Sequence, residues 1–373
     1  MKLVVLGLSL SSSWGNGHAT TYRALLSAFA DRGHEITFLE RDMPWYASRR
    51  DLHDPRYCRL AFYNDVAELQ RWSDEIARAD AVMVGSYVPD GVTVGGFVQD
   101  VAEGVSVFYD IDTPVTLAKL RRGDQDYITP ELIAGYDLYL SFTGGPTLDL
   151  LERRYKSPAA RALYCSVDPA AYPPLDIPKR WDLSYLGTYS PDRQPRLETL
   201  LIEPARAMPN LRFAVAGPQY PGTIDWPDNV ERIDHLPPAE HALFYNASRY
   251  TLNVTRDDMI AAGWSPSVRL FEAAATGTPI ISDVWEGIGT LLEPDREILL
   301  AERTDRVMRL LLQDHHAVGA AARACVLASH SAAHRAAQLE QHLRDAQQPV
   351  RAVPYVMARE PVEADAEVAR SLP

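Results

Sequence analysis

The sequence lacks most features of proteins that cross membranes or carry disulfides. Its 373 residues include three cysteines, Cys58, Cys165 and Cys325, and their odd number and wide spacing fit neither a disulfide framework nor a zinc site. No apolar run reaches the length of a membrane-spanning helix, and the apolar run over residues 1–8 is shorter than a signal peptide requires. We therefore expect a cytoplasmic protein without a transmembrane segment.

Positive charge is also scarce. Lys and Arg together number 37 against 50 Asp and Glu, which gives a formal net charge of −13. Because phosphate-rich partners recruit basic surfaces, broad binding to nucleic acid or to an anionic membrane is not expected, although a local basic pocket is compatible with this charge. The hydrophobic content of 46% is that of an ordinary globular enzyme, and the length predicts about two domains.

The first half of the chain alternates strands and helices. A strand over 4–8, a glycine loop ending at His18, a helix over 19–32 and a strand over 35–39 predict a Rossmann-like opening, although the G-x-G-x-x-G dinucleotide fingerprint is absent. The loop residues are Gly15, Asn16 and Gly17. An imidazole can take a proton from a hydroxyl near neutral pH, so His18 is a candidate general base. Alternatively, it bonds the backbone of its own loop.

Two further segments of this half carry candidates. A predicted strand over 105–109 ends in Asp110 and Asp112, at the edge where open α/β sheets bind ligands. Either carboxylate can orient an acceptor or His18, or can cap the next helix instead. The segment from Arg41 to Tyr63 is predicted to be irregular and precedes a helix over 64–79. Its aromatic residues can stack on sugar rings in an acceptor site or pack the loop itself. The candidates there are Trp45 and Tyr46.

A stretch with four prolines, Ser166 to Pro178, predicts a stiff linker. The predicted organisation is therefore an N-terminal domain over 1–165, a linker over 166–180, a C-terminal domain over 181–345 and a tail over 346–373.

In the second domain, small residues and arginines follow predicted strands, as in turns that bind phosphate. These candidates for a nucleotide diphosphate or base are Gly187, Thr188, Arg193, Gly217, Thr255 and Arg256.

The most informative stretch is 265–283. Ser265 is the predicted N-cap of a helix, and Gly277 is predicted to end it in a left-handed conformation. Arg269 and Glu272 are three residues apart, so they share a face near the helix N-terminus, where anions are favoured. A cation suits a diphosphate, and a carboxylate suits the two hydroxyls of a ribose. The pattern predicts a site for a nucleoside diphosphate.

The motif Arg-x-x-Glu-Ala-x-x-x-Gly-x-Pro-Ile-Ile resembles the donor-site helix of GT-B glycosyltransferases, which have two Rossmann-like domains facing each other across a cleft. Ser267-Val-Arg-Leu-Phe-Glu-Ala and Ser282-Asp-x-Trp-Glu-Gly-Ile resemble the CgeB-like (spore-maturation-protein-like) branch. The resemblance implies that Glu272 holds the donor ribose, Arg269 faces the diphosphate, and Asp283 or Glu286 bonds the sugar. The glycine loop before His18 would face the sugar or the acceptor. One departure is Trp264, because many retaining members carry a second glutamate at this position, eight residues before Glu272.

These observations predict an α/β protein of GT-B type. The expected activity is a hexosyltransferase-type glycosyltransferase that moves a sugar from a nucleotide-diphosphate sugar to an unidentified acceptor, without a metal or other cofactor. If His18 is the base, inversion is the simplest mechanism; otherwise transfer with retention stays open. The alternatives are a nucleotide-sugar epimerase of the same fold and a non-catalytic nucleotide-sugar-binding or coat-assembly protein. An NAD-dependent oxidoreductase is disfavoured by the missing fingerprint.

Overall fold

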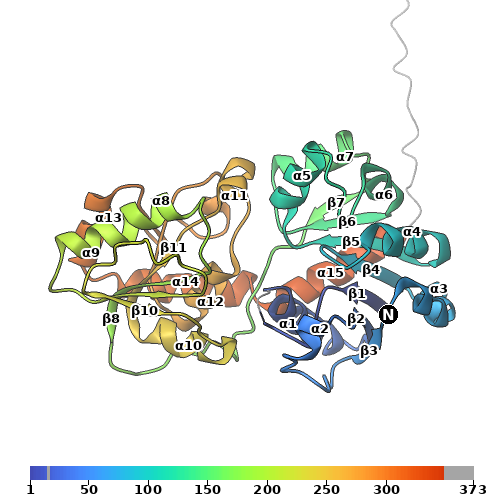
Figure 1. Cartoon of the computed structure of the whole chain (residues 1–373), viewed down its shortest axis with the longest axis horizontal. Helices are drawn as coiled ribbons and strands as arrows, with labels where there is room; N and C mark the ends of the chain where they lie inside the picture. Colours follow the sequence, from blue (N-terminus) through green and yellow to red (C-terminus); the bar gives the residue numbers. More distant parts are fainter. Residues whose placement is uncertain (15–16, 348–373) are drawn as a thin grey trace, which may run out of the picture.

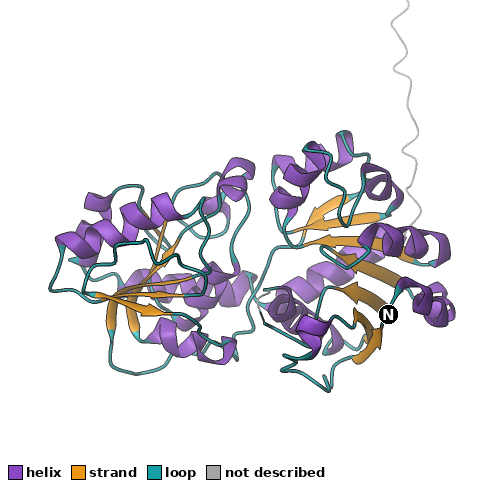
Figure 2. Cartoon of the chain, in the orientation of Figure 1, coloured by secondary structure: helices purple, strands orange, loops and turns teal. Residues whose placement is uncertain are grey.

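The computed structural model describes residues 1–14 and 17–347. Two α/β domains lie side by side, joined by the linker that passes between them (Figure 1). Each domain has a parallel sheet with helices on its faces (Figure 2). Strands of such sheets are buried on both faces, which explains uninterrupted apolar runs such as Ala81-Val-Met-Val. No helix within the described ranges is long and apolar enough to cross a membrane.

The N-terminal domain contains a seven-stranded sheet of order β3-β2-β1-β4-β5-β6-β7. Its strands are β1 (Lys2–Gly7), β2 (Glu35–Arg41), β3 (Arg59–Tyr63), β4 (Ala81–Gly85), β5 (Val105–Asp110), β6 (Leu138–Ser141) and β7 (Ala160–Ala162). Its helices are α1 (His18–Ala30), α2 (Pro44–Ala47), η1 (Val66–Trp72), α3 (Ser73–Ala77), α4 (Gly91–Val101), α5 (Thr113–Arg121), α6 (Pro130–Gly135) and α7 (Pro146–Arg153).

Two expectations for this domain were wrong. The segment over 41–63 is not irregular throughout, because it contains α2 and the edge strand β3. That strand buries only Tyr63, so it lacks the apolar pattern of an interior strand. The single helix expected over 64–79 is a 3-10 helix, η1, followed by the short α3. Asp65 caps η1 by accepting a 3.0 Å hydrogen bond from the backbone N–H of Glu68.

The C-terminal domain contains a six-stranded sheet of order β10-β9-β8-β11-β12-β13. Its strands are β8 (Trp181–Leu186), β9 (Phe213–Ala216), β10 (Val230–Ile233), β11 (Ser248–Asn253), β12 (Ile280–Ser282) and β13 (Leu299–Leu300). The helices of this half are α8 (Gln194–Leu197), the π-helix η2 (Glu198–Ile202), α9 (Glu203–Ala207), α10 (Pro238–Asn246), α11 (Asp257–Ala262), α12 (Val268–Thr276), η3 (Ile288–Thr290), α13 (Thr304–Leu311), α14 (His316–Ser329) and α15 (Ala332–Gln347).

Helix α12 starts later than the sequence indicated. Ser267, not Ser265, precedes its first residue, because the Ser265 side chain instead bonds Thr143 of the N-terminal domain at 2.9 Å. The predicted end is confirmed: Gly277 has φ +78°, a conformation that residues with a Cβ atom resist.

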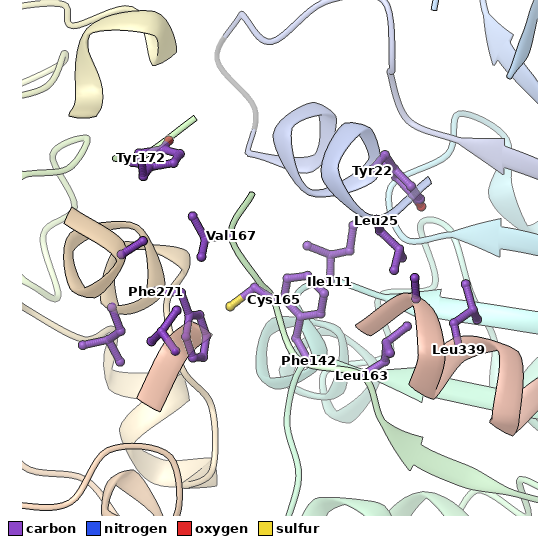
Figure 3. Close-up of a cluster of buried hydrophobic side chains, with 14 of the residues drawn as sticks. Tyr22, Leu25, Ile111, Phe142, Leu163, Cys165, Val167, Tyr172, Phe271 and Leu339 are labelled. Atoms are coloured by element: carbon purple, nitrogen blue, oxygen red, sulfur yellow. The ribbon is translucent and has the colours of Figure 1, made fainter. Parts of the chain in front are cut away.

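The two domains share one continuous hydrophobic core beside the linker. Leu25 of α1, Phe142, Cys165 and Phe271 of α12 belong to the same buried cluster (Figure 3). The chain crosses back at the end of α14, and α15 packs against α1 of the N-terminal domain (Figure 1). The predicted C-terminal domain over 181–345 had included most of α15. Of the expected tail over 346–373, residues 348–373 lie outside the described ranges.

Candidate functional site

The candidate residues of the C-terminal domain follow the ends of its strands. Gly187 follows β8, Gly217 follows β9, Thr255 lies just beyond β11, and Asp283 follows β12. Because these strands are parallel, their carboxyl ends meet at one edge of the sheet, where open α/β sheets bind ligands. The fold thus brings together residues that lie up to a hundred positions apart in the sequence.

Arg269 holds two strand ends in place. Its Nε donates a 2.5 Å hydrogen bond to the carbonyl of Leu186, and its Nη1 donates to Asn253 Oδ1 at 2.9 Å. Its guanidinium also lies 4.9 Å from the ring centre of Tyr185. A Cβ atom on Gly187 would lie 2.8 Å from Nη2 of Arg269, so only glycine lets this loop approach the guanidinium. The charge is therefore fixed directly beside the loop after β8.

A second arginine, Arg193, contacts the same loop, and Arg256 lies close enough to Arg193 to influence its pKa. Nη2 of Arg193 donates a 2.5 Å hydrogen bond to the carbonyl of Thr188, while its buried Nε has no partner among the described residues. Burial lowers the pKa of Arg193 below its usual value, and the nearby charges of Arg269 and Arg256 act in the same direction. Within the described part of the chain, none of the three arginines forms an ion pair. Such a concentration of positive charge without direct ion pairs suits an anion with several oxygens.

Glu272 is buried on the same helix as Arg269. Its Oε1 accepts a 2.8 Å hydrogen bond from the Tyr172 hydroxyl, and its Oε2 accepts one of 3.2 Å from the Tyr245 hydroxyl. Nδ1 of His241 lies 3.9 Å from the same Oε2. An ionised carboxylate has about four lone-pair sites, so it can still accept two donors such as ribose hydroxyls.

A cavity of about 590 Å³ lies between α1 and the linker and reaches Glu272. Arg23 and Tyr57 belong to its N-terminal wall, and Tyr172 and Val268 to the opposite side. The cavity therefore has walls from both domains, although of the candidate residues it is lined by Glu272 and not by His18, Asp112 or the three arginines.

On the N-terminal side, His18 is the first residue of α1 and is buried. Its ring meets that of Tyr87 edge-on at 5.4 Å, and the Tyr87 hydroxyl donates a 3.3 Å hydrogen bond to Asp112 Oδ2. Burial lowers the pKa of His18 to about 4, so the imidazole is neutral at pH 7. Burial raises the pKa of Asp112, whereas Arg256 of the other domain acts in the opposite direction. His18 and Asp112 are thus linked through Tyr87, and Asp112 lies near Arg256 of the other domain.

Asp110 is fully buried and turned into its own domain. It accepts hydrogen bonds from the Tyr139 hydroxyl at 2.5 Å, from the Thr116 hydroxyl at 2.9 Å and from the backbone N–H of Asp112 at 3.1 Å. Burial raises the pKa of Asp110 to about 6, although these bonds act in the opposite direction. Its contacts stabilise the turn that presents Asp112, whereas Asp112 alone of the pair contacts Tyr87.

Asp283 and Glu286 have different surroundings. Asp283 is buried and accepts hydrogen bonds from the backbone N–H of Thr255 at 2.8 Å and from its hydroxyl at 2.7 Å. It therefore fixes the loop that leads to Arg256. The Glu286 side chain is exposed, while its carbonyl accepts a 2.6 Å hydrogen bond from the N–H of Trp264. Glu286 thus has an exposed carboxylate, whereas the carboxylate of Asp283 is bonded to Thr255.

The remaining candidates that the structure describes form few or no polar side-chain contacts with the groups above. Gly217 has φ +141°, and a Cβ atom there would lie 2.1 Å from the carbonyl of Gly187. Gly17 precedes α1, and its carbonyl accepts a 3.3 Å hydrogen bond from the N–H of Thr21. Trp45 is 50% exposed, whereas Tyr46 is buried. Two candidates fall outside the described residues: Gly15 and Asn16.

Sequence reasoning missed the three tyrosines that connect these groups. Tyr87, Tyr172 and Tyr245 come from a loop after β4, from the linker and from α10. None stands at a recognisable spacing from its partner, so no local signal could have identified them.

The sequence profile of a family described as glycosyl transferase-like matches residues 193–341. None of the curated proteins matches the sequence. Among solved structures, sucrose-phosphate synthase from Thermosynechococcus elongatus aligns with a TM-score of 0.67 at 15% identity, over 92% of this chain and 99% of the other. HepE from Anabaena, in complex with UDP and glucose, also gives a TM-score of 0.67, at 12% identity over 92% and 99% of the two chains.

A putative UDP-N-acetylglucosamine 2-epimerase from Listeria monocytogenes is similar as well, with a TM-score of 0.55 at 12% identity over 92% of this chain and 96% of the other. At such identities the likeness shows the fold alone, and that fold confirms the predicted GT-B architecture. The choice of activity depends on the profile match and on the geometry of the site.

Proposed function

We infer that this chain, a glycosyltransferase of GT-B type, transfers a hexose from a nucleoside-diphosphate sugar to an acceptor hydroxyl. The inference rests on two groups of residues, one in each domain. Three arginines that form no ion pair among the described residues lie in the same domain as Glu272, and the other domain holds the neutral, buried His18 next to Tyr87. A diphosphate donor needs the first set, and removal of an acceptor proton needs the second.

The donor would bind through the C-terminal domain. Arg193, Arg256 and Arg269 would neutralise the diphosphate, and Glu272 would accept hydrogen bonds from the ribose hydroxyls. As the bond between the sugar C1 and the diphosphate oxygen breaks, negative charge grows on that oxygen. Fixed guanidinium groups stabilise this charge more in the transition state than in the bound donor, which accelerates the reaction.

The acceptor would bind against the N-terminal domain. In the simplest mechanism, the acceptor oxygen attacks C1 while His18 takes the hydroxyl proton, so the configuration at C1 inverts. The resulting imidazolium would be favoured by the negative charge of Asp112, which is linked to it through Tyr87. In this scheme Asp112 positions Tyr87 and supplies negative charge. Asp110 holds Asp112 in place by accepting a hydrogen bond from its backbone N–H.

Three finer assignments belong to the proposal. The chain is a member of the CgeB-like branch, supported by the sequences around Arg269 and Asp283. It works without a metal or other cofactor, since arginines can supply the positive charge that the leaving diphosphate needs. It acts in the cytoplasm, where its three free cysteines would stay reduced.

A sugar-nucleotide epimerase is the second candidate, because a putative epimerase shares the fold. Epimerisation needs an acid and a base beside the sugar ring. Of the two carboxylates expected there, Asp283 is engaged by Thr255, which leaves Glu286. The transferase is therefore favoured.

The test is a thermal-shift screen with UDP, GDP, ADP, dTDP and their glucose conjugates, followed by product analysis. A ligand at a hundredfold excess over its Kd stabilises the folded state by about 2.7 kcal/mol, which is readily measured. Selective stabilisation by one diphosphate and its sugar is expected. Conversion of that sugar nucleotide into its epimer without an acceptor would favour the second candidate. No stabilisation by any of these ligands would contradict both.

A further inference from the structure

The indole of Trp264 lies against two glycines from different domains. Gly145 precedes α7 in the N-terminal domain with φ +57°, and Gly287 precedes η3 in the C-terminal domain with φ +92°. A Cβ atom on Gly145 would lie 2.5 Å from Cδ2 and Cε3 of the indole, and one on Gly287 would lie 2.5 Å from Cδ1 and Cγ. Contacts this short do not occur, so a side chain at either position would push the indole aside.

Hydrogen bonds hold the same three segments together. The Gly144 N–H donates a 3.0 Å hydrogen bond to the Trp264 carbonyl across the domain boundary, and the Trp264 N–H donates one of 2.6 Å to the Glu286 carbonyl. Beside them, the buried hydroxyls of Thr143 and Ser265 are bonded at 2.9 Å. Trp264 itself has φ +41°, an unfavourable conformation for a bulky residue that persists only where its surroundings impose it.

We propose that Trp264 is an interdomain positioning residue. Its indole, packed against Gly145 and Gly287, fixes the loop over residues 283–287 of the C-terminal domain against the N-terminal domain. This role rests on the proposed function, because transfer requires the two walls of the cleft at a set separation. The exposed carboxylate of Glu286 is then presented at a constant position.

The position of the indole argues against a role in stacking on a sugar. Cβ positions built on both glycines lie within 3.0 Å of Cγ and Cδ2, so this part of the indole packs against the two loops. Trp264 therefore acts through the loops that it joins. It also occupies the position at which many retaining relatives carry a glutamate, so a transferase of this kind would hold its sugar by other groups, such as the exposed carboxylate of Glu286.

The chain offers matched controls for a test. Gly33 and Gly123 also have positive φ values, +86° and +78°, but no atom lies within 4 Å of a Cβ atom built there. Alanine at these two positions introduces the same backbone strain without an indole to displace. The variants to compare are Gly145→Ala, Gly287→Ala and Trp264→Ala with the controls Gly33→Ala and Gly123→Ala.

Two readouts on the free full-length protein follow the contact directly. In G145A, G287A and W264A we expect the Gly144 amide to exchange its hydrogen at least about tenfold faster, because its acceptor moves away. We also expect a larger radius of gyration by X-ray scattering. The Kd for UDP should stay within about twofold, since the arginines and Glu272 are not in contact with the indole. The control variants should match the wild type in all three measurements.

Unchanged exchange at Gly144 and unchanged scattering in G145A and G287A would overturn the positioning role. If W264A does not fold, G145A and G287A still test the positioning role, because each of them only adds one methyl group. Failure of the proposed function has a different signature: the wild type would not bind UDP or any other nucleoside diphosphate, whereas the exchange and scattering results would be unaffected.

Discussion

The hydroxyl of Tyr172, in the linker between the two domains, donates a 2.8 Å hydrogen bond to Oε1 of Glu272 on α12. The candidate ribose-binding carboxylate is thereby tied to the segment that joins the domains. Tyr245 on α10 holds the other oxygen, so the orientation of Glu272 is fixed from two sides before any ligand contact is considered.

The first prediction concerns nucleotide binding by Glu272. Glu272→Gln keeps the shape of the side chain but removes its charge and turns one acceptor into a donor. Because hydrogen bonds to charged groups contribute about 1.5–3 kcal/mol, we expect the Kd for the preferred nucleoside diphosphate to rise about ten- to hundredfold, measured by titration calorimetry. Glu340→Gln is the control, since Glu340 is also buried but pairs with Arg32 of the N-terminal domain. Equal affinity in both variants would contradict the assignment.

The second prediction separates the diphosphate from the nucleoside. Arg193→Ala should weaken binding of UDP by about tenfold or more, because a charge-assisted contact to phosphate is lost, and should leave the weaker binding of uridine unchanged. The affinity for UDP should also depend less steeply on salt concentration. Arg309→Ala, which removes an exposed arginine paired with Asp305, is the control. A parallel loss of uridine binding would assign Arg193 to a structural role.

The third prediction concerns His18 as a base. His18→Ala should lower kcat by about 10²–10⁴-fold, the usual contribution of a positioned base, with little change in donor affinity. Because burial lowers the pKa of His18 to about 4, the rate should not decline near pH 6.5, and its acidic limb should lie closer to pH 4. His53→Ala, an exposed histidine of the same domain, should behave as the wild type. A wild-type rate in H18A would exclude His18 as the base.

The fourth prediction concerns acid stability at the end of α14. Burial and the neighbouring Arg335 lower the pKa of His330 to about 4, against 6.5 for an ordinary histidine. Between these values the unfolded chain binds a proton that the folded chain does not, so folded-state stability is fully retained above pH 6.5 and decreases as the pH falls toward 4.

His330→Gln should therefore flatten the dependence of the free energy of unfolding on pH in this window, as measured by urea denaturation. The variant will also lose the 2.7 Å hydrogen bond between Arg335 Nη2 and His330 Nδ1. The free energy of unfolding of each protein at lower pH is therefore compared with its own value at pH 7. His316→Gln, at the N-terminal end of the same helix, is the control. An unchanged slope between pH 4 and 6.5 in H330Q would contradict the prediction.

The sequence by itself determined the alternation of strands and helices, the end of α12 at Gly277 and the placement of Arg269 and Glu272 on one helix. These features depend on periodicity and on the conformational freedom of single residues, which are local properties. The same local signals failed for β3 and η1, where burial is slight, and for the start of α12, where Ser265 is engaged by another domain.

Only the tertiary structure decided which groups meet. It joined Tyr172 to Glu272, linked His18 to Asp112 through Tyr87, and turned Asp110 and Asp283 toward their own domains. It also placed α15 on α1 and the indole of Trp264 between two glycines 142 positions apart. Such contacts arise from how two sheets and their loops pack together, and no spacing along the chain encodes them.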